Sequence, residues 1–311
     1  MSGSADNLCS NAKTMGEHGR VPLITVAMPI YNAGRHLRLA VKSILLQTIS
    51  DWELLIIDDG STDRALANIT DIIDPRIKIL SDGQNRGLAA RLNEAIDRAR
   101  GEFFARMDQD DVSYPDRFAM QLALLRKEPS LDVVTIRAIL IDENDQAIGQ
   151  FPFVDQHKTI TARPWQGFHF PHPTWMGKLS WFRQYRYAQP APYFCEDQEL
   201  LLRSYRFSRF GMVDKVAFAY RVRDRFNLAK QIKTRRALWV VQFAHFWKKR
   251  QLLHALLSTG VFIARILADG MRIRAWQLNQ KPPLRAVNPE FVTRWKQVCD
   301  ILLKPSRINT A

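Results

Sequence analysis

Short apolar runs of strand length alternate with segments of helical periodicity through the first half of the chain. The runs lie at residues 23–31, 52–60, 76–80, 102–108 and 131–140. Between them, apolar residues recur three and four positions apart, as in amphipathic helices, at residues 34–48, 61–73 and 87–99. Strands that alternate with helices build βαβ units. We therefore predict an α/β fold with a mostly parallel central sheet.

Two residues are expected to mark the starts of helices. Ser61 is placed to cap the helix predicted at residues 61–73, and Pro115 suits the first turn of a helix that follows the fourth strand. Beyond residue 150 the alternation weakens. Residues 195–207 still have the pattern of a helix start followed by an apolar stripe.

Acidic residues follow two of the predicted strands. Asp58 and Asp59 end the second, and the segment "DQDD" at residues 108–111 ends the fourth. In parallel α/β sheets, ligands bind beyond the carboxyl ends of the strands. Mg²⁺ and Mn²⁺ prefer oxygen ligands and usually take one or two carboxylates together with substrate phosphates. A solvated acidic loop is the alternative for a lone D-x-D, but acidic pairs at two equivalent strand ends favour a metal–diphosphate ligand.

Several chemical patterns do not occur in the chain. The absence of G-x-x-x-x-G-K-[ST] disfavours a P-loop, and the first strand–helix turn, "PIYNAGR", is not the G-x-G-x-x-G of dinucleotide dehydrogenases. Neither H-E-x-x-H nor G-x-S-x-G is present. The widely spaced Cys9, Cys195 and Cys299 form no disulfide framework, which fits a reducing compartment.

Four segments, taken in order, resemble family 2 glycosyltransferases of the GT-A fold. They are residues 24–63, residues 85–118, "HPTWM" at 172–176 and "EDQELLLR" at 196–203. The resemblance covers roughly residues 22–223. It implies an inverting enzyme of polysaccharide or lipopolysaccharide biosynthesis. Such an enzyme moves a sugar from a nucleotide-diphosphate sugar, a UDP-sugar by family habit, to a hydroxyl of a glycan or lipid-linked acceptor.

The resemblance also implies which residues bind the donor. Pro29 and Tyr31 would wall the nucleobase, and Asp59 would hydrogen-bond to it. Arg91 would approach the ribose or the phosphates, and Asp108 the ribose or the metal.

A divalent cation, Mn²⁺ or Mg²⁺, is implied at the D-x-D. Asp110 would ligate the metal that bridges the diphosphate. Asp111 would instead support the residues around the metal or cap the next helix. The family often carries a histidine near this metal, in "YRxH". Here the segment reads "YRVR", with Arg223 in that place. An arginine at this position would neutralise phosphate and would not ligate a metal.

On the acceptor side, the resemblance makes Asp197 the general base. The alternative for Asp197 and Glu196 is a pair of acids at a helix N-terminus, where the helix dipole favours them. His172 is a candidate for the acceptor pocket. Trp175 is either a ring that stacks on a sugar face or a packed core residue.

Basic residues concentrate at the end of the chain. The net charge of the whole chain is +14, and residues 221–311 hold 19 Lys and Arg against 4 Asp and Glu. Aromatic residues interleave with the cations, as in helices that lie on anionic membranes. A helical cap with a solvated basic face is the alternative. We expect a peripheral protein on the cytoplasmic face of the cell membrane.

These observations predict three parts of the chain: a disordered tail at 1–20, a glycosyltransferase domain at 21–225 and a basic amphipathic helical region at 226–311. Two other functions stay open. A sugar-phosphate nucleotidylyltransferase would share the nucleotide-binding sheet, although its glycine-rich phosphate loop is missing. A basic nucleic-acid-binding protein would explain the charge, but no RRM, KH or zinc-finger pattern supports it, so we expect no nucleic-acid partner.

Overall fold

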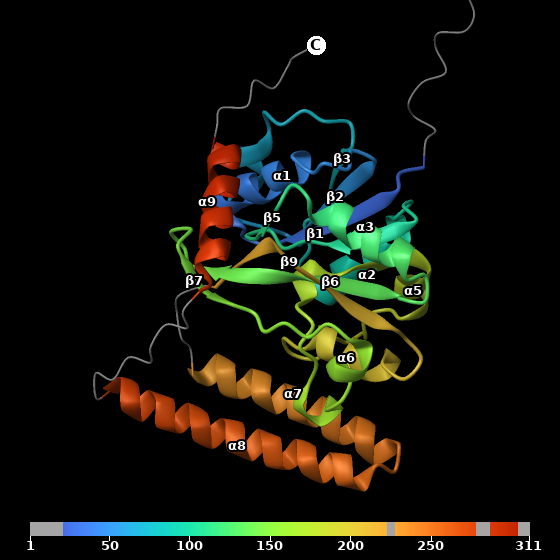
Figure 1. The fold of residues 1–311 in the computed structure, drawn as a ribbon, viewed down its shortest axis with the longest axis vertical. Helices are drawn as coiled ribbons and strands as arrows, with labels where there is room; N and C mark the ends of the chain where they lie inside the picture. Colours follow the sequence, from blue (N-terminus) through green and yellow to red (C-terminus); the bar gives the residue numbers. More distant parts are fainter. Residues whose placement is uncertain (1–20, 223–227, 278–286, 304–311) are drawn as a thin grey trace, which may run out of the picture.

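A computed structural model describes residues 21–222, 228–277 and 287–303 (Figure 1). The predicted tail at 1–20 and Arg223 lie outside the described residues. Residues 223–227 do too, so the predicted domain boundary at residue 225 stays a prediction.

A nine-stranded sheet forms the centre of the molecule. Its first half is parallel, as predicted, in the order β3-β2-β1-β4, with bounds β1 Ile24–Ile30, β2 Trp52–Asp58, β3 Ile77–Ser81 and β4 Phe103–Arg106. The second half is mixed: β8 is antiparallel to β4 and β6, β6 is parallel to β9, and β5 and β7 add antiparallel edges. Its bounds are β5 Val112–Ser113, β6 Val133–Ile141, β7 Ala147–Gln150, β8 Met176–Lys178 and β9 Phe210–Arg221.

Helices cover both faces of the sheet. The α-helices are α1 Leu37–Leu45, α2 Leu88–Arg98, α3 Arg117–Lys127, α4 His157–Ile160, α5 Leu179–Gln184, α6 Glu196–Ser204, α7 Leu228–Lys248, α8 Leu252–Gln277 and α9 Pro289–Leu303. Short 3-10 turns are η2 Gly34–His36, η3 Ala65–Ile69, η4 Pro164–Gln166 and η5 His172–Thr174.

The α-helix predicted at 61–73 is wrong, because only the short 3-10 turn η3 forms there. Side chains capture the backbone before a helix can start: Asp58 accepts from the N–H of Ser61, and Asn32 accepts from the N–H of Thr62. Such local bonds compete with helix formation. Ser61 is therefore no cap; its hydroxyl accepts from the N–H of Asn32. The prediction for Pro115 is also wrong, since this residue precedes the N-cap Asp116 of α3.

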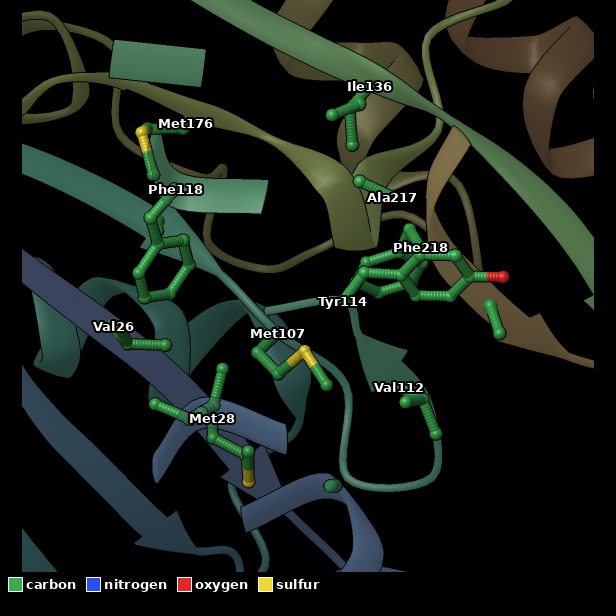
Figure 2. Close-up of a cluster of buried hydrophobic side chains, with 14 of the residues drawn as sticks. Val26, Met28, Met107, Val112, Tyr114, Phe118, Ile136, Met176, Ala217 and Phe218 are labelled. Carbon is green, nitrogen blue, oxygen red and sulfur yellow. The ribbon is translucent and has the colours of Figure 1, made fainter. Parts of the chain in front are cut away.

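Two hydrophobic cores lie on opposite faces of the sheet, because side chains alternate along each strand. Val26 and Met28 of β1 point into a first core with α1, α3 and η3, part of which Figure 2 shows. Ala27, between them, points into a second core with α2, α5 and α6. The sheet is thus the middle layer of three, and its strand ends are fixed from both sides.

The C-terminal helices lie in two places. α9 packs on the first core through Trp295, Val298 and Leu302. α7 packs on α6 at the second core, through Phe246, and α8 lies along α7 on its outer side (Figure 1). The stretch predicted as one basic helical region therefore divides: α9 belongs to the sheet domain, while α7 and α8 form a separate layer.

Candidate functional site

The carboxyl ends of three neighbouring parallel strands carry the predicted donor residues. The register pairs Ile30 of β1 with Asp58 of β2, and Ala27 of β1 with Arg106 of β4. The residues that follow these strands therefore share one edge of the sheet. Of the two predicted base-wall residues, Pro29 is buried within β1 and Tyr31 is half exposed just after it.

The "DQDD" loop, residues 108–111, is clamped at both ends by the first core. Met107 precedes it and Val112 follows it, and both side chains are fully buried (Figure 2). Gln109 ties the loop to β1: its Oε1 accepts from the N–H of Tyr31 at 2.6 Å, and its Nε2 donates to the Tyr31 carbonyl at 3.0 Å. The loop thus has a fixed shape beside Tyr31.

Arg221, at the end of β9, also holds this loop in place. Its backbone N–H donates to Oδ1 of Asp111 at 2.8 Å, and its Nε donates to the carbonyl of Asp110 at 2.8 Å. Asp111 is buried, whereas the residues Asp108 and Asp110 are partly exposed. Asp111 therefore supports the loop and does not cap α3, and the two outer acids of the D-x-D can reach a ligand.

The electrostatics of the loop suit a divalent cation. Burial, followed by the charges of Asp108 and Asp110, raises the pKa of Asp111 well above its usual range. Its Oδ2 has no hydrogen-bond partner, although the residue is buried. Among residues 21–222, 228–277 and 287–303, no three His, Cys, Asp or Glu side chains form a complete metal cage. A D-x-D that supplies only some of the ligands fits a cation that also takes phosphate oxygens.

Asp59 and Arg91 form one buried network behind the strand edge. Asp59 accepts from the backbone N–H of Arg86 at 2.6 Å, from that of Gly87 at 3.0 Å, and from Nε of Arg91 at 2.8 Å. The other guanidinium nitrogens of Arg91 bond to Asp82 and Glu94. The network fixes the loop that leads into α2. The predicted contacts of Asp59 and Arg91 with a donor stay predictions.

Arg106 was missed by the sequence reasoning and lies at the centre of the site. The side chain is 3% exposed and its Nη2 pairs with Oδ1 of Asp108 at 2.6 Å. Its Nε and Nη1 have no hydrogen-bond partner. An arginine inside the apolar run "FFARMD" was the signal, since a buried charge needs a partner. Its positive charge lowers the pKa of both Glu196 and Asp197, which burial raises.

Glu196 and Asp197 are the first two residues of α6. Burial, and then the charge of Asp197, raises the pKa of Glu196 to about 7. Burial is also the largest cause of the raised pKa of Asp197, which a bond from the Gln198 side chain opposes. Adjacent carboxyls of this kind titrate as a pair. One of them is therefore ready to hold a proton near neutral pH.

His172 lies beside these two acids. Its Nδ1 is 3.7 Å from Oε1 of Glu196, and its Nε2 is 2.6 Å from the hydroxyl of Tyr187. Burial and the charge of Arg106 hold its pKa well below the usual range, so the ring is neutral. Nothing in the sequence pattern singled out Tyr187, because only the folded chain brings it to this histidine.

A pocket of about 200 Å³ opens next to Asp197. Its lining includes Phe168, His169, Phe170, His172, Asp197 and Gln198. Trp175 is fully buried beneath it, and its Nε1 donates to the carbonyl of Phe170 at 3.0 Å. Of the two predictions for Trp175, the structure therefore favours the packed core residue over a ring that stacks on a sugar.

The chain is similar to known glycosyltransferases in sequence. The model of the family described as glycosyl transferase family 2 matches residues 25–186. The putative glycosyltransferase EpsE of Bacillus subtilis (strain 168) is 39% identical over 129 residues, which are 39% of this chain and 45% of EpsE. WfgD of Escherichia coli, a UDP-Glc:alpha-D-GlcNAc-diphosphoundecaprenol beta-1,3-glucosyltransferase, is 35% identical over 105 residues, 34% of this chain and 42% of WfgD. The chain spans less than half the length of these two relatives.

The fold is similar to that of solved GT-A structures. The mannosyltransferase PcManGT from Pyrobaculum calidifontis, in complex with GDP-Man and Mn²⁺, gives a TM-score of 0.56 at 18% sequence identity. The match covers 92% of this chain and 82% of that chain. The predicted GT-A fold is thereby confirmed.

Proposed function

The chain belongs to glycosyl transferase family 2, and we propose that it transfers a sugar, with inversion, from a nucleotide-diphosphate sugar to a hydroxyl of a glycan or lipid-linked acceptor. One observation carries this proposal. The two outer acids of the D-x-D in the "DQDD" loop and the pair Glu196–Asp197, all partly exposed, lie near the buried cation Arg106, which pairs with Asp108 and whose charge lowers the pKa of both Glu196 and Asp197. The first pair suits a leaving diphosphate, and the second lies beside a pocket for the acceptor.

The donor occupies the carboxyl edge of β1, β2 and β4 in this proposal. Tyr31 has an exposed ring for a nucleobase, and the bonds from Gln109 hold its backbone. Asp59 accepts a bond from the base, or fixes the loop that the base contacts. The name of WfgD specifies UDP-Glc, whereas PcManGT was solved with GDP-Man. We propose a UDP-sugar, since WfgD shares the higher sequence identity.

Asp110, with help from Asp108, would hold Mn²⁺ or Mg²⁺ against the diphosphate. When bound, the cation neutralises the negative charge that builds on the leaving group. Arg106 orients Asp108 through their 2.6 Å ion pair. Arg221 holds the backbone of Asp110 and the carboxylate of Asp111, so the loop keeps its shape as charge accumulates.

Asp197 is the general base in this proposal. It lines the pocket, where an acceptor hydroxyl would lie against it, and it takes the proton of that hydroxyl as the oxygen attacks the sugar. A raised pKa makes its carboxylate a stronger base. A single displacement by that oxygen inverts the anomeric configuration. His172, being neutral, holds the hydroxyl of Tyr187 without adding a competing positive charge.

The proposal is tested by screening nucleotide-sugars for thermal stabilisation of the protein with Mn²⁺ present. A ligand that binds only the folded state raises its stability. We expect one UDP-sugar to raise the melting temperature more than the others, and to release UDP when an acceptor is supplied. Stabilisation by none of the UDP- or GDP-sugars would contradict the proposal.

A further inference from the structure

The α7–α8 hairpin, residues 228–277, has an unusual outer surface. One side of α8 exposes a row of apolar residues three to seven positions apart, here called the outer stripe: Leu253, Leu256, Ile263, Leu267 and Met271. Each of the five is more than half exposed. At 1.5 Å per residue, the stripe is about 27 Å long. Residues 252–272 have a mean hydropathy of 1.5, and 17% of the most apolar window is buried.

The charged residues of this part of α8 point the other way. Between residues 252 and 271 the chain carries two charged residues, Arg265 and Asp269. Asp269 is buried and pairs with Arg235 of α7. Arg265 donates from Nη2 to the carbonyl of Gln166 at 2.7 Å. A helix on the surface of a soluble protein has the opposite arrangement, with its apolar side chains packed inward and its charged side chains exposed to water. The outer stripe is therefore built for a non-aqueous environment.

We propose that the outer stripe lies in the interfacial layer of an anionic membrane, with the α7–α8 hairpin parallel to the bilayer. The hairpin carries ten Lys and Arg against one acidic residue, Asp269. Exposed cations stand at both ends of the stripe, Lys248, Lys249 and Arg250 at the α7–α8 turn and Arg272 and Arg274 at the far end. In this position the apolar side chains would contact the lipid acyl chains, and the cations at both ends would contact the anionic headgroups.

The charge also decides between a membrane and a second copy of the chain. Two copies that met through this stripe would bring two hairpins of the same strong positive charge together. Repulsion of this kind disfavours association. A lipid surface supplies the negative charge that a second copy lacks.

The hairpin is joined to the wall of the pocket beside Asp197. Gln242 of α7 donates to the carbonyl of Pro164 at 2.9 Å, and Arg265 of α8 holds Gln166. The chain continues from this point into Phe168, whose N–H donates to Oε1 of Gln198, next to Asp197, at 2.8 Å. A docked hairpin would therefore hold the pocket close to the lipid surface. Resting on the proposed function, this makes a membrane-borne glycolipid the acceptor class.

Flotation of the full chain with lipid vesicles tests the docking directly. We expect the protein to float with phosphatidylcholine vesicles that contain phosphatidylglycerol, and much less with phosphatidylcholine alone. The double variant Leu256→Glu, Leu267→Glu should lose at least about tenfold in vesicle affinity, because charges at those positions must leave the apolar layer. The triple variant Lys248→Glu, Lys249→Glu, Arg250→Glu should lose roughly a hundredfold in vesicle affinity, since each cation near an anionic surface contributes roughly fivefold.

A matched control is Ile73→Glu, an 89% exposed apolar residue in the loop between η3 and β3. The strand β3 and the helix α8 lie at opposite ends of the molecule (Figure 1). This variant should float as the wild type does. Thermal stabilisation by UDP with Mn²⁺ should be the same in all variants, which separates a failure of docking from a failure of the proposed function. Wild-type protein that floats with neither vesicle would overturn the proposal. So would a double variant that floats normally, or one whose only change is from dimer to monomer in sedimentation.

Discussion

At the scale of single residues, the site depends on a positive charge that the protein keeps out of water. Arg106 has two guanidinium nitrogens without hydrogen-bond partners, and a third that pairs with Asp108. Buried unpaired donors are costly unless something compensates. The compensation is electrostatic: the charges of Asp108 and Asp111 raise the pKa of Arg106, and the charge of Arg106 in turn lowers the pKa of Glu196 and of Asp197.

Asp197→Asn tests the general base. The amide keeps the shape of the side chain but cannot take a proton, so turnover should fall about 10²–10⁴-fold. Donor affinity should not change, because Asp197 lines the pocket that we propose for the acceptor. Product release and the Kd of UDP are the two measurements, with the exposed Glu128→Gln as the control. A parallel collapse of donor affinity would assign Asp197 to the donor site or to the structure instead.

Glu196→Gln should move the pH dependence of the rate. A general base works only when deprotonated, so activity is lost as the pH falls through the titration of the Glu196–Asp197 pair. In the wild type this loss should begin near the Glu196 pKa of about 7. Removing the charge of Glu196 removes a like charge next to Asp197, so the acidic limb should shift to lower pH. An unchanged limb in kcat/KM would show that the pair does not set the rate.

At the scale of elements, the strand ends are held by side chains that reach across from helices and later strands. Asp59 at the end of β2 is tied to α2 by Arg91, and the loop after β4 is tied to β9 by Arg221. Arg117 of α3 is fully buried and donates to the carbonyl of Arg106 at 2.9 Å. Its burial lowers its pKa to about 9. These ties pre-organise the edge on which a donor would bind.

Arg91→Met should destabilise the protein. The guanidinium is 1% exposed and its removal leaves Asp59 buried without its ionic partner, which typically costs about 3–5 kcal/mol in unfolding free energy. Urea unfolding gives the measurement. Arg98→Met, on the same helix with a 53% exposed side chain, is the matched control and should change stability little. Equal stability of Arg91→Met and wild type would show that the network contributes nothing.

The strands and helices with a clear apolar pattern, and the site residues that follow them, could be predicted from the sequence. Their burial and spacing depend on residues that are close together in the chain. The parallel strands β1 to β4, the helix α2 and the position of the "DQDD" loop are of this kind. The α-helix expected at 61–73 failed because side chains capture its first N–H groups: Asp58 is a near neighbour in the sequence, but Asn32 reaches Thr62 only in the folded chain. Tyr187 and Arg221 could not be predicted, since only long-range packing brings them to His172 and Asp111.

At the scale of the whole molecule, the acidic strand ends lie in one part of the protein, and the exposed cations and exposed apolar side chains of the hairpin lie in another. The sheet carries the acids at its carboxyl strand ends, and the α7–α8 hairpin carries cations and the outer stripe. The hairpin forms a layer of its own beside the sheet (Figure 1). α9 returns to the sheet domain, where Arg294 pairs with Asp116 and Trp295 donates to the carbonyl of Asp145. In the sequence the hairpin therefore lies between β9 and α9, which both pack in the sheet domain. A chain that enters and leaves the hairpin at the sheet domain is the arrangement expected if the hairpin sets the orientation of that domain on a surface.

The central claim is that the "DQDD" loop is a metal-dependent site for a nucleoside diphosphate. Calorimetric titration of UDP into the full chain, with and without Mn²⁺, tests it most directly. We predict that Mn²⁺ tightens UDP binding to the wild type and to Asp197→Asn, and that Asp110→Asn loses this effect while its thermal unfolding stays unchanged. Binding of UDP that is equally tight with and without Mn²⁺, or that Asp110→Asn leaves unaltered, would contradict the claim.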